Sequence, residues 1–326
     1  MEDRELLKYA VEHGMINLTY VRSEMEMNKK KEILKKYGGC IWYSEKEKYW
    51  YCHIPDDTRT SGRKKVKCKK KADIENVVYE YYLPLEEHED KKAMSFSELF
   101  FDYLVHKQTQ VKPVTIKRML VDWNKFYVGS DFIEKRFTEI SKVDVDDFLN
   151  GVLIQYHPKD KNFKNLCGIM KQTFEYAVDS DLLEKSPYRI SKINKKNITR
   201  SRKAPSEKEV FTPEEQMVLT QEMERRIQED ESYLIPWAIL LDFEIGARMG
   251  EVLALKDTDI ANEKIHIQRQ LVEDYDTSDL NNVKRAGLQV VDYTKSECGN
   301  RWVPLTKKAK EYIKAIVDIN QRKLCK

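Results

Sequence analysis

Hydrophobic positions along this chain recur mainly at intervals of three and four residues, the spacing of one face of an α-helix. Between residues 94 and 188 this spacing predicts four or five helices. One stripe comprises Ile116, Met119, Leu120, Trp123 and Phe126. A longer stripe comprises Phe163, Leu166, Cys167, Met170, Phe174, Ala177 and Val178. We interpret both stripes as core, so any function of this region belongs to its polar faces.

Between residues 38 and 83 the pattern changes to short strands followed by a helix. Gly38-Gly39 marks a turn, and the aromatic runs 41–43 and 49–51 flank a charged turn, as in a β-hairpin. The basic segment 63–71 predicts a third strand, and helical spacing returns at Ile74, Val77, Val78 and Tyr81. We therefore expect a βββα unit. One sheet face, with Tyr43 and Trp50, packs on the helix, and the other presents Lys, Arg and aromatic side chains.

The last third of the chain mixes helices and strands. Residues 212–215 (TPEE) combine a Thr cap, a Pro at the first helical position and acidic residues in the first turn, so a new domain begins near Val210. An apolar helix over 234–243 runs into Gly246, and a second apolar helix is expected after Glu251. Period-two alternation predicts a strand over 264–272. Two more strands are predicted over 288–305, joined by a turn, with Lys295 at the end of the first.

These patterns predict a mainly α fold with small β-sheets, an α+β class. Only 11 of the 326 residues are glycine, which agrees with a largely helical chain. The expected order is an N-terminal helical segment (1–37, with an apolar face at Leu6, Leu7, Tyr9 and Ala10), the βββα unit (38–83), a polar linker (84–93), a helical domain (94–188), a basic linker (189–209) and a last domain (210–326).

Composition narrows the functional classes. Charged residues make up 35% of the chain, and no stretch approaches the roughly 20 apolar residues of a membrane-spanning helix, so we expect no membrane partner. The first residues carry no secretory signal pattern. Six cysteines include no CxxC pair, and Cys40, Cys52, His53 and Cys68 lack the close ligand pairs of a zinc module. We expect a reduced, cytoplasmic protein without a metal.

Charge is distributed unevenly. The net charge is only +3, but residues 59–71 hold eight basic residues and no acidic one, and residues 189–203 hold seven and none. The two blocks carry +15, which leaves −12 on the rest of the chain. A single lysine run is often a solvated loop, whereas two such blocks, one of them on a strand, favour contact with nucleic-acid phosphates.

A β-sheet can enter the major groove of DNA, so the third strand of the βββα unit is the first candidate surface. Polar faces of the helical domain and the basic linker are the others. The candidate DNA-binding residues are Arg63, Lys64, Lys65, Lys67, Lys69, Lys112, Thr115, Lys117, Lys164, Lys171, Lys195, Lys196, Arg200 and Arg202.

Arg248 is the strongest candidate for chemistry. It stands between Gly246 and Gly250 at a helix–helix junction, so its guanidinium projects from a rigid corner. An arginine held in this way suits bidentate binding of a phosphate. Glu251, three residues on, can support it. The alternative is an Arg–Glu pair that only closes a helical turn.

The segment 246–255 (GARMGEVLAL) with Asp259-Ile260 resembles the first arginine motif of the tyrosine recombinases, the phage and transposon integrases. Thr294-Lys295 followed by 301–305 (RWVPL) resembles the family's β-hairpin lysine segment. The helical domain is similar to the family's core-binding domain. The βββα unit is similar to the arm-binding domain of integrases from conjugative transposons and related phages.

The resemblance implies DNA integration and recombination without metal, ATP or other cofactor, through a 3′-phosphotyrosine intermediate. Arg248 would stabilise the pentacovalent phosphorane, Lys295 would protonate the leaving 5′ oxygen, and Glu251 would give catalytic support. Implied partners are double-stranded DNA at core and arm sites and, for the full-length protein, further copies of itself on DNA.

The sequence departs from the family after Lys295. The family's His-x-x-Arg helix and nucleophilic tyrosine are expected there, but residues 306–326 contain no His. We reject His266-x-x-Arg269 because it precedes Lys295 on a predicted strand, where we expect both side chains to face outward. We interpret Tyr312 as a helix-face residue. Asp257 stands where the family often has an aromatic residue.

We therefore expect a C-terminally incomplete member whose residues 210–326 are a partial catalytic domain. The full-length protein would be a DNA strand transferase, and this chain would bind DNA without cutting it. The alternative is a non-catalytic DNA-binding protein that occupies recombination sites. A type IB topoisomerase or resolvase relative is disfavoured by the arm-like unit.

Overall fold

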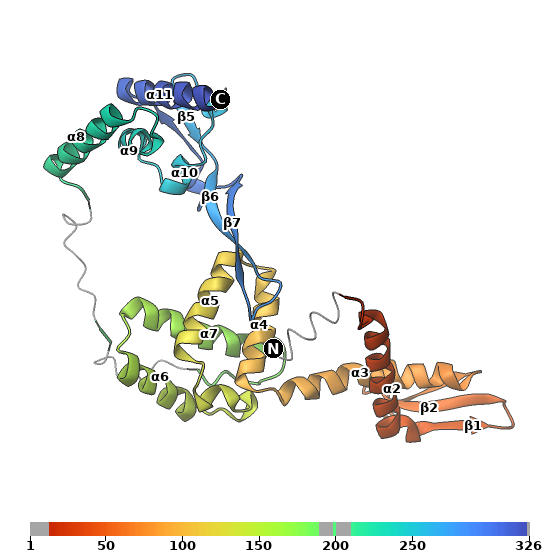
Figure 1. The fold of residues 1–326 in the computed structure, drawn as a ribbon. Coiled ribbons are helices and arrows are strands. Elements are labelled where there is room, and N and C mark those ends of the chain that lie inside the picture. Colours follow the sequence, from red (N-terminus) through yellow and green to blue (C-terminus); the bar gives the residue numbers. More distant parts are fainter. Residues whose placement is uncertain (1–12, 189–197, 200–209, 325–326) are drawn as a thin grey trace. The chain divides into compact units, whose positions relative to one another are not determined.

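The structure is a computed structural model that describes residues 13–188, 198–199 and 210–324 (Figure 1). The predicted apolar face at 6–10 and the basic residues Lys195, Lys196, Arg200 and Arg202 lie outside the described residues. The described residues form two compact units. The first comprises residues up to 99 with 134–140 and 177–186, and the second comprises 100–133, 141–176 and the described residues from 187 onward. No helix in the described ranges is long and apolar enough to span a membrane.

The N-terminal part of the first unit contains the predicted βββα arrangement. Its elements are α2 (Leu18–Tyr37), the 3₁₀ turn η1 (Gly38–Cys40), β1 (Ile41–Ser44), β2 (Tyr49–Pro55), β3 (Arg63–Cys68) and α3 (Lys71–Lys92). The strands form an antiparallel sheet in the order β1-β2-β3. Because side chains alternate across a strand, one face carries Cys52 and Val66, which pack with Ile74 and Val78 of α3. Among the described residues of this unit, no helix covers the other face.

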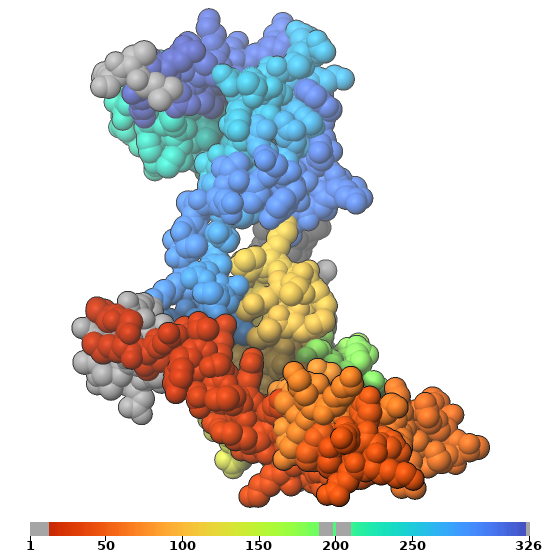
Figure 2. Space-filling view, turned by 90° about the vertical axis from the view of Figure 1, so that its right-hand side faces the viewer, coloured from red at the N-terminus to blue at the C-terminus, as the bar shows by residue number. Residues whose placement is uncertain are grey.

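The helix α3 continues to Lys92, through a segment (84–93) that the sequence predicted to be a polar linker. Pro84 lies inside it. The polar residues of this segment pair with α2: Lys36 Nζ lies 2.8 Å from Glu86 Oε1, and Lys29 Nζ lies 2.9 Å from Glu87 Oε1. The rings of Tyr37 and Tyr82 also stack between the two helices. Figure 2 shows α2 against the β1–β3 and α3 surface, in red to orange. The polar composition therefore reflects a helix paired with another charged helix.

Four α-helices follow between residues 94 and 188, as predicted. They are α4 (Phe96–Gln108), α5 (Pro113–Phe126), α6 (Lys142–Tyr156) and α7 (Asp160–Asp179), with 3₁₀ turns η2 (Asp131–Glu134) and η3 (Phe137–Glu139). Within the second unit, the ring of Trp123 stacks on Phe100 and Tyr127 at centroid distances of 3.9 and 4.6 Å. The Tyr127 hydroxyl donates to the Leu166 carbonyl at 2.8 Å. The apolar stripes are therefore core, as the spacing predicted.

The C-terminal part of the second unit combines helices with two small antiparallel sheets, β4-β5-β8 and β6-β7. Its elements are α8 (Pro213–Glu229), α9 (Leu234–Ile245), α10 (Met249–Val252), η6 (Asp257–Asp259), β4 (Ile260–Ala261), β5 (Lys264–Ile267), β6 (Gln270–Asp276), β7 (Lys284–Val291), η7 (Glu297–Gly299), β8 (Arg301–Pro304) and α11 (Lys307–Leu324). Thr212 caps α8 through a capping box with Glu215, as the sequence predicted. The core joins α9, β5 and α11 through Leu241, Ile245, Ile265 and Ala309.

Three local predictions in this part were wrong. The strand predicted over 264–272 is two strands in different sheets, β5 and β6. The strands predicted over 288–305 do not pair with each other, since β7 pairs with β6 and β8 with β5. The apolar helix expected after Glu251 is only the four-residue α10, because Val252 and Leu255 turn onto the α9–β5–α11 core instead. The overall class is nonetheless the predicted one, mainly helical with small antiparallel sheets.

Candidate functional site

The corner that carries Arg248 is set by the end of α9. Gly246 has a φ of +57°, a left-handed conformation that favours glycine, and its amide donates to the Asp242 carbonyl at 2.8 Å. The Ala247 amide donates to Asp242 Oδ1 at 2.9 Å. Burial raises the pKa of the Asp242 carboxyl. These bonds hold residues 246–248 in a defined path away from the helix.

Gly250 is required by a close approach of backbone. A Cβ at this position would lie 2.7 Å from the Leu271 carbonyl oxygen on β6. Any side chain would therefore push α10 away from β6. The two glycines that flank Arg248 have different physical reasons, a left-handed turn at Gly246 and a missing side chain at Gly250.

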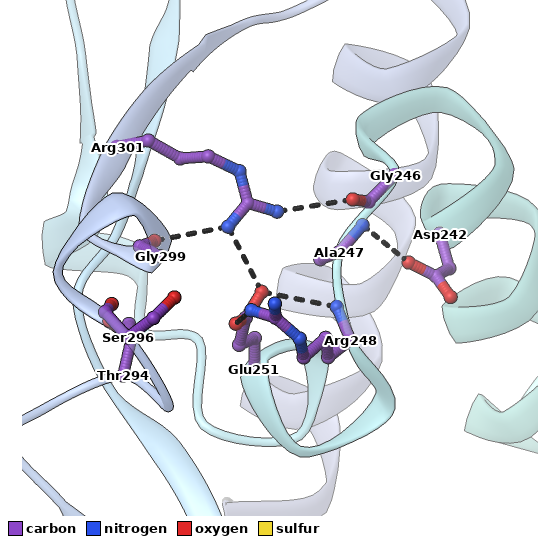
Figure 3. Close-up of polar contacts among 9 residues, drawn as sticks. All are labelled: Asp242, Gly246, Ala247, Arg248, Glu251, Thr294, Ser296, Gly299 and Arg301. Carbon is purple, nitrogen blue, oxygen red and sulfur yellow. Dashed lines mark hydrogen bonds and ion pairs between the residues drawn. The ribbon is translucent and has the colours of Figure 1, made fainter.

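Glu251 is the buried centre of the site, with 1% of its surface exposed. Its Oε1 accepts from Arg248 Nη1 at 2.7 Å, and its Oε2 accepts from the Arg248 amide at 3.1 Å (Figure 3). Oε2 also accepts from Arg301 Nη1 at 3.2 Å. Burial alone would raise the pKa of Glu251, but the bonds from the Arg248 amide and from both guanidiniums outweigh it and hold the pKa below its ordinary value.

Arg301 was not among the predicted site residues. From β8 it donates through Nη1 to the Gly299 carbonyl at 3.0 Å as well as to Glu251, and through Nη2 to the Gly246 carbonyl at 3.1 Å. In the sequence, the feature that could have indicated Arg301 is its position at the start of the RWVPL segment, seven residues after Thr294. Nothing in the sequence indicates its pairing with Glu251, which lies 50 positions away.

Arg248 and Arg301 differ in how many donors remain for a ligand. A guanidinium has five N–H donors. Within the described part of the chain, the Arg248 side chain uses one on Glu251 and is 53% exposed, whereas Arg301 uses three and is 30% exposed. A pocket of about 320 Å³ lies between them, lined by Gly246, Ala247, Arg248, Ser296, Cys298, Gly299 and Arg301. Two positive charges on one carboxylate leave this pocket with a net +1, which suits an anion.

Lys295 lies on the segment that borders this pocket, but not at the end of a strand. β7 ends at Val291, and Lys295 is an exposed residue in the connection to η7. Its neighbour Thr294 donates through Oγ1 to the Ser296 carbonyl at 2.7 Å. A Cβ on Gly299 would lie 2.6 Å from Thr294 Oγ1, so this connection is tightly packed. Ser296 and Gly299 line the pocket. The structure therefore brings Arg248, Glu251 and the Lys295 segment together.

The side chains of His266 and Arg269, which we rejected as a catalytic pair, were expected to face solvent, but both contact other residues. Arg269 was predicted to face outward, but only 12% of its side chain is exposed, and it forms an ion pair with the buried Asp259. Asp259 also accepts from Gln268 Nε2 at 2.9 Å and from the Lys256 amide at 2.8 Å. This inward turn of residues 268–269 is what separates β5 from β6. His266 stacks on Trp302 with a centroid distance of 4.4 Å.

Tyr312 on α11 packs against the α9–β5–α11 core, with its ring 6.2 Å from that of Trp237 between centroids. Burial raises its pKa, and the negative charges of Glu244, Glu224 and Glu311 raise it further. A tyrosine in this setting is held as a neutral phenol on a helix face.

The open face of the β1–β3 sheet carries a row of basic and aromatic side chains. Lys65 Nζ lies 4.1 Å from the ring centre of Tyr51, and Lys67 Nζ lies 5.2 Å from that of Tyr49. The pairing register places Arg63, Lys65 and Lys67 on this face, and Lys64 on the face of Val66. Lys69 is exposed just after β3. Trp50 packs on α3 as expected, but Tyr43 is 45% exposed.

A groove between α5 and α7 gathers some of the predicted residues of the helical region. Thr115 and Lys164 line it, together with Lys107, Arg118 and Lys161, which the sequence analysis missed. Arg118 and Lys161 stand three positions from Thr115 and Lys164, the spacing of one helical face, so periodicity could have found them. The remaining predicted residues, Lys112, Lys117 and Lys171, do not line this groove. Both Lys171, outside the groove, and Lys164, inside it, form ion pairs, with Glu175 at 3.5 Å and with Asp160 at 2.8 Å.

The described residues contain no group of three His, Cys, Asp or Glu side chains placed to hold a metal ion. In the βββα core, burial is the largest cause that raises the pKa of the Cys52 thiol, and together with the nearby Cys40 and Cys68 it brings the pKa to about 11. A neutral thiol of this kind acts as an apolar core residue.

No family model matches the chain. It is 27% identical over 196 residues to a curated protein named "Tyrosine recombinase XerC-like" from Caldanaerobacter subterraneus subsp. tengcongensis, covering 60% of this chain. The chain spans about half the length of that relative, 47%.

Among solved structures it is similar to the Tn1549 transposon integrase in complex with transposon right end DNA, with 18% identity and a TM-score of 0.52. The match covers 69% of this chain and 65% of that one. A second structure of the same integrase, with a circular intermediate DNA, gives 19% identity and a TM-score of 0.50 at the same coverage. These two structures show a shared fold.

Proposed function

We propose that the chain is a member of the tyrosine recombinase and integrase family, that it binds double-stranded DNA, and that it receives one phosphodiester at Arg248. The observation that carries the proposal is the attachment of two arginines to one buried carboxylate, Glu251. Arg248 keeps most of its donors for a ligand, and the net +1 of the pocket complements the single negative charge of a phosphodiester.

In a family member this site serves phosphoryl transfer to a tyrosine. The tyrosine oxygen bonds to phosphorus while the bond from phosphorus to the 5′ oxygen breaks, which leaves a 3′-phosphotyrosine. Arg248 stabilises the pentacovalent phosphorane, and Lys295 protonates the leaving 5′ oxygen. Glu251 holds Arg248 in place. One phosphodiester replaces another, so the exchange needs no cofactor and no external energy source.

Two further surfaces serve DNA binding in this proposal. On the sheet, the Lys65 ammonium lies over the rings of Trp42 and Tyr51. Cation–π attraction holds the ammonium on the open face, where it can contact a phosphate. In the helical region, the α5–α7 groove carries basic side chains on both walls. We assign the sheet to an arm-type site and the groove to the core site.

These 326 residues are proposed to bind DNA without forming a covalent adduct. Tyr312 is the only tyrosine after Lys295 in the sequence, and it packs in the α9–β5–α11 core. That packing also favours the second candidate function, a DNA-binding protein without catalysis that occupies recombination sites. Both functions use the same DNA surfaces and differ only in whether a nucleophile reaches the phosphate at Arg248.

Fluorescence anisotropy with a labelled 30-bp duplex over a series of salt concentrations tests the binding. We expect affinity to fall steeply with salt, and Arg248→Met to reduce the slope of log K against log salt by about 1, because one phosphate contact is lost. Arg322→Met on α11, which removes an exposed ion pair with Glu231, is the matched control and should leave the slope unchanged. No DNA binding, or an unchanged slope in Arg248→Met, would overturn the proposal.

A nicked suicide duplex tests the absence of cleavage. A tyrosine recombinase traps itself on such a substrate, because the short cleaved strand diffuses away before it can be rejoined. We expect no denaturant-resistant protein–DNA adduct from this chain. An adduct, and its loss in Tyr312→Phe, would show that Tyr312 is the nucleophile and that the packed position of its ring is not the reactive one.

A further inference from the structure

We propose that Arg301 is a positioning residue that sets Arg248 and the Lys295 segment relative to each other. The inference rests on the proposed function, because it concerns how the same phosphate pocket is assembled. It assigns a role to the first residue of the RWVPL segment, for which the sequence analysis gave none. Its basis is the set of three acceptors that one guanidinium reaches.

Those acceptors come from three separate elements of the second unit. Nη1 donates to Glu251 on α10 and to the Gly299 carbonyl at the end of η7, and Nη2 donates to the Gly246 carbonyl just after α9 (Figure 3). The backbone of Arg301 is itself fixed, because β8 pairs with β5 and places Arg301 opposite Ile267. The guanidinium therefore joins the arginine corner and the lysine segment to the β4-β5-β8 sheet.

The bond to Glu251 determines how Arg248 is held. Glu251 Oε2 has two donors, the Arg248 amide at 3.1 Å and Arg301 Nη1 at 3.2 Å, and Oε1 is left for Arg248 Nη1. Without Arg301 the buried carboxylate would have one guanidinium partner, which is itself half exposed to solvent. Two cations keep the carboxylate ionised and its plane fixed, so that Arg248 meets a phosphate with its orientation already set.

The bond to Gly299 extends this control to Lys295. Gly299 packs so closely on Thr294 that a Cβ would lie 2.7 Å from the Thr294 Cβ. Thr294 directly precedes Lys295, and its hydroxyl closes the turn by donating to the Ser296 carbonyl. Holding the Gly299 carbonyl therefore fixes the segment from which the lysine projects. With most of its polar head occupied in this way, Arg301 acts through its neighbours rather than on the phosphate.

The test is a titration of the whole chain with dimethyl phosphate, a phosphodiester with one negative charge. The readout is the Arg248 Nε–H signal in ¹⁵N–¹H NMR spectra, assigned by its loss in Arg248→Met. We expect a saturable shift in the unaltered chain and about tenfold weaker binding in Arg301→Met, with the Arg248 signal still present. Arg301→Lys should recover only part of the loss, because an ammonium can reach Glu251 but not both carbonyls at once.

The 30-bp duplex separates positioning from direct contact. If Arg301 acts only through Arg248 and Lys295, adding Arg301→Met to the double variant Arg248→Met/Lys295→Met should not weaken binding further. Arg322→Met is again the control for loss of an arginine in the same unit. Circular dichroism establishes that each variant is folded. If Arg301→Met is unfolded, the binding measurements are made with Arg301→Lys instead.

The outcomes are distinct. Unaltered dimethyl phosphate binding in both Arg301 variants overturns the inference and leaves the proposed function standing. A further loss when Arg301→Met is added to Arg248→Met/Lys295→Met also overturns it, because Arg301 would then contact the phosphate itself or act through general stability. No response of Arg248 to dimethyl phosphate in the unaltered chain overturns the proposed function, and the inference falls with it.

Discussion

The Arg248 pocket and the β1–β3 sheet are both positively charged, but they are built in opposite ways. In the pocket, a carboxylate with 1% exposure holds two guanidiniums at distances of 2.7 and 3.2 Å. On the sheet, exposed lysines lie over aromatic rings, on a face that no helix in the described part of the unit covers. The pocket fixes a few charges precisely in space, whereas the sheet gathers many charges loosely.

This difference predicts different costs of substitution. A charge in the pocket is buried or bonded to a buried group, so its loss leaves polar atoms unsatisfied and affects folding as well as binding. A charge on the sheet is exposed, so its loss affects DNA affinity and salt dependence but hardly stability.

Glu251→Gln should have the largest effect on stability. The amide keeps the shape but removes the charge and turns donors towards two arginines, which costs about 3 kcal/mol in unfolding free energy, as for other broken buried pairs. Urea unfolding followed by fluorescence measures it. Glu263→Gln, at an exposed carboxylate paired with Lys310, is the control and should leave the unfolding midpoint unchanged. Equal unfolding midpoints for Glu251→Gln and the unaltered chain would contradict the claim that a buried, ionised Glu251 holds both arginines.

The same pair of proteins predicts a pH dependence. The pKa of Glu251 in the folded chain lies below its ordinary value. Its stabilising contribution is therefore fully present above the unfolded pKa of about 4.3 and is lost as the pH falls through the folded pKa. The stability difference between the unaltered chain and Glu251→Gln should thus be constant from pH 7 to 6 and shrink below pH 4. If the stability difference grew as the pH fell, the pKa of Glu251 in the folded chain would be raised rather than lowered, which would contradict the prediction.

Gly250→Ala should rank next. The new Cβ would meet a backbone carbonyl, that of Leu271, at 2.7 Å, so α10 or β6 must move at a cost of roughly 1–3 kcal/mol. Gly299→Ala would meet the Thr294 side chain instead and shift the Lys295 segment, so we expect a smaller loss of stability. Gly151→Ala, in α6 with open space around it, should be neutral or stabilising. Urea unfolding of the three variants gives the ranking, and an unaffected Gly250→Ala would contradict the close approach.

The two regions also differ in how far the sequence could predict them. The sheet was predictable, since strand alternation and a local run of basic residues are both visible within 30 positions. Capping of α6 and α8 at Ser141 and Thr212 is equally local. In the pocket, the local pattern indicated Arg248 and Glu251, three residues apart, and the family resemblance added the Lys295 segment. Arg301 lies 50 positions from Glu251, and the split of β5 from β6 depends on Asp259 binding Arg269, so neither leaves a local pattern.

Replacing Arg63, Lys64, Lys65 and Lys67 together by Ala should weaken binding to the 30-bp duplex and make its salt dependence shallower. Three of the four lie on the open face, so the slope of log K against log salt should fall by about 3. The urea midpoint should stay near that of the unaltered chain, because all four side chains are exposed. Unchanged affinity and slope would place the DNA-binding surface elsewhere.

The smallest expected effect separates two adjacent lysines of the same strand. Lys65 lies on the open face over Tyr51, and Lys64 lies on the face that carries Val66. If DNA meets the open face, Lys65→Ala should reduce the salt slope by about 1 and Lys64→Ala should not, although both remove one charge from the same basic block. Anisotropy with the 30-bp duplex measures both slopes. Equal effects would mean that DNA responds to the charge of the block as a whole, and that the sheet face has no part in selecting it.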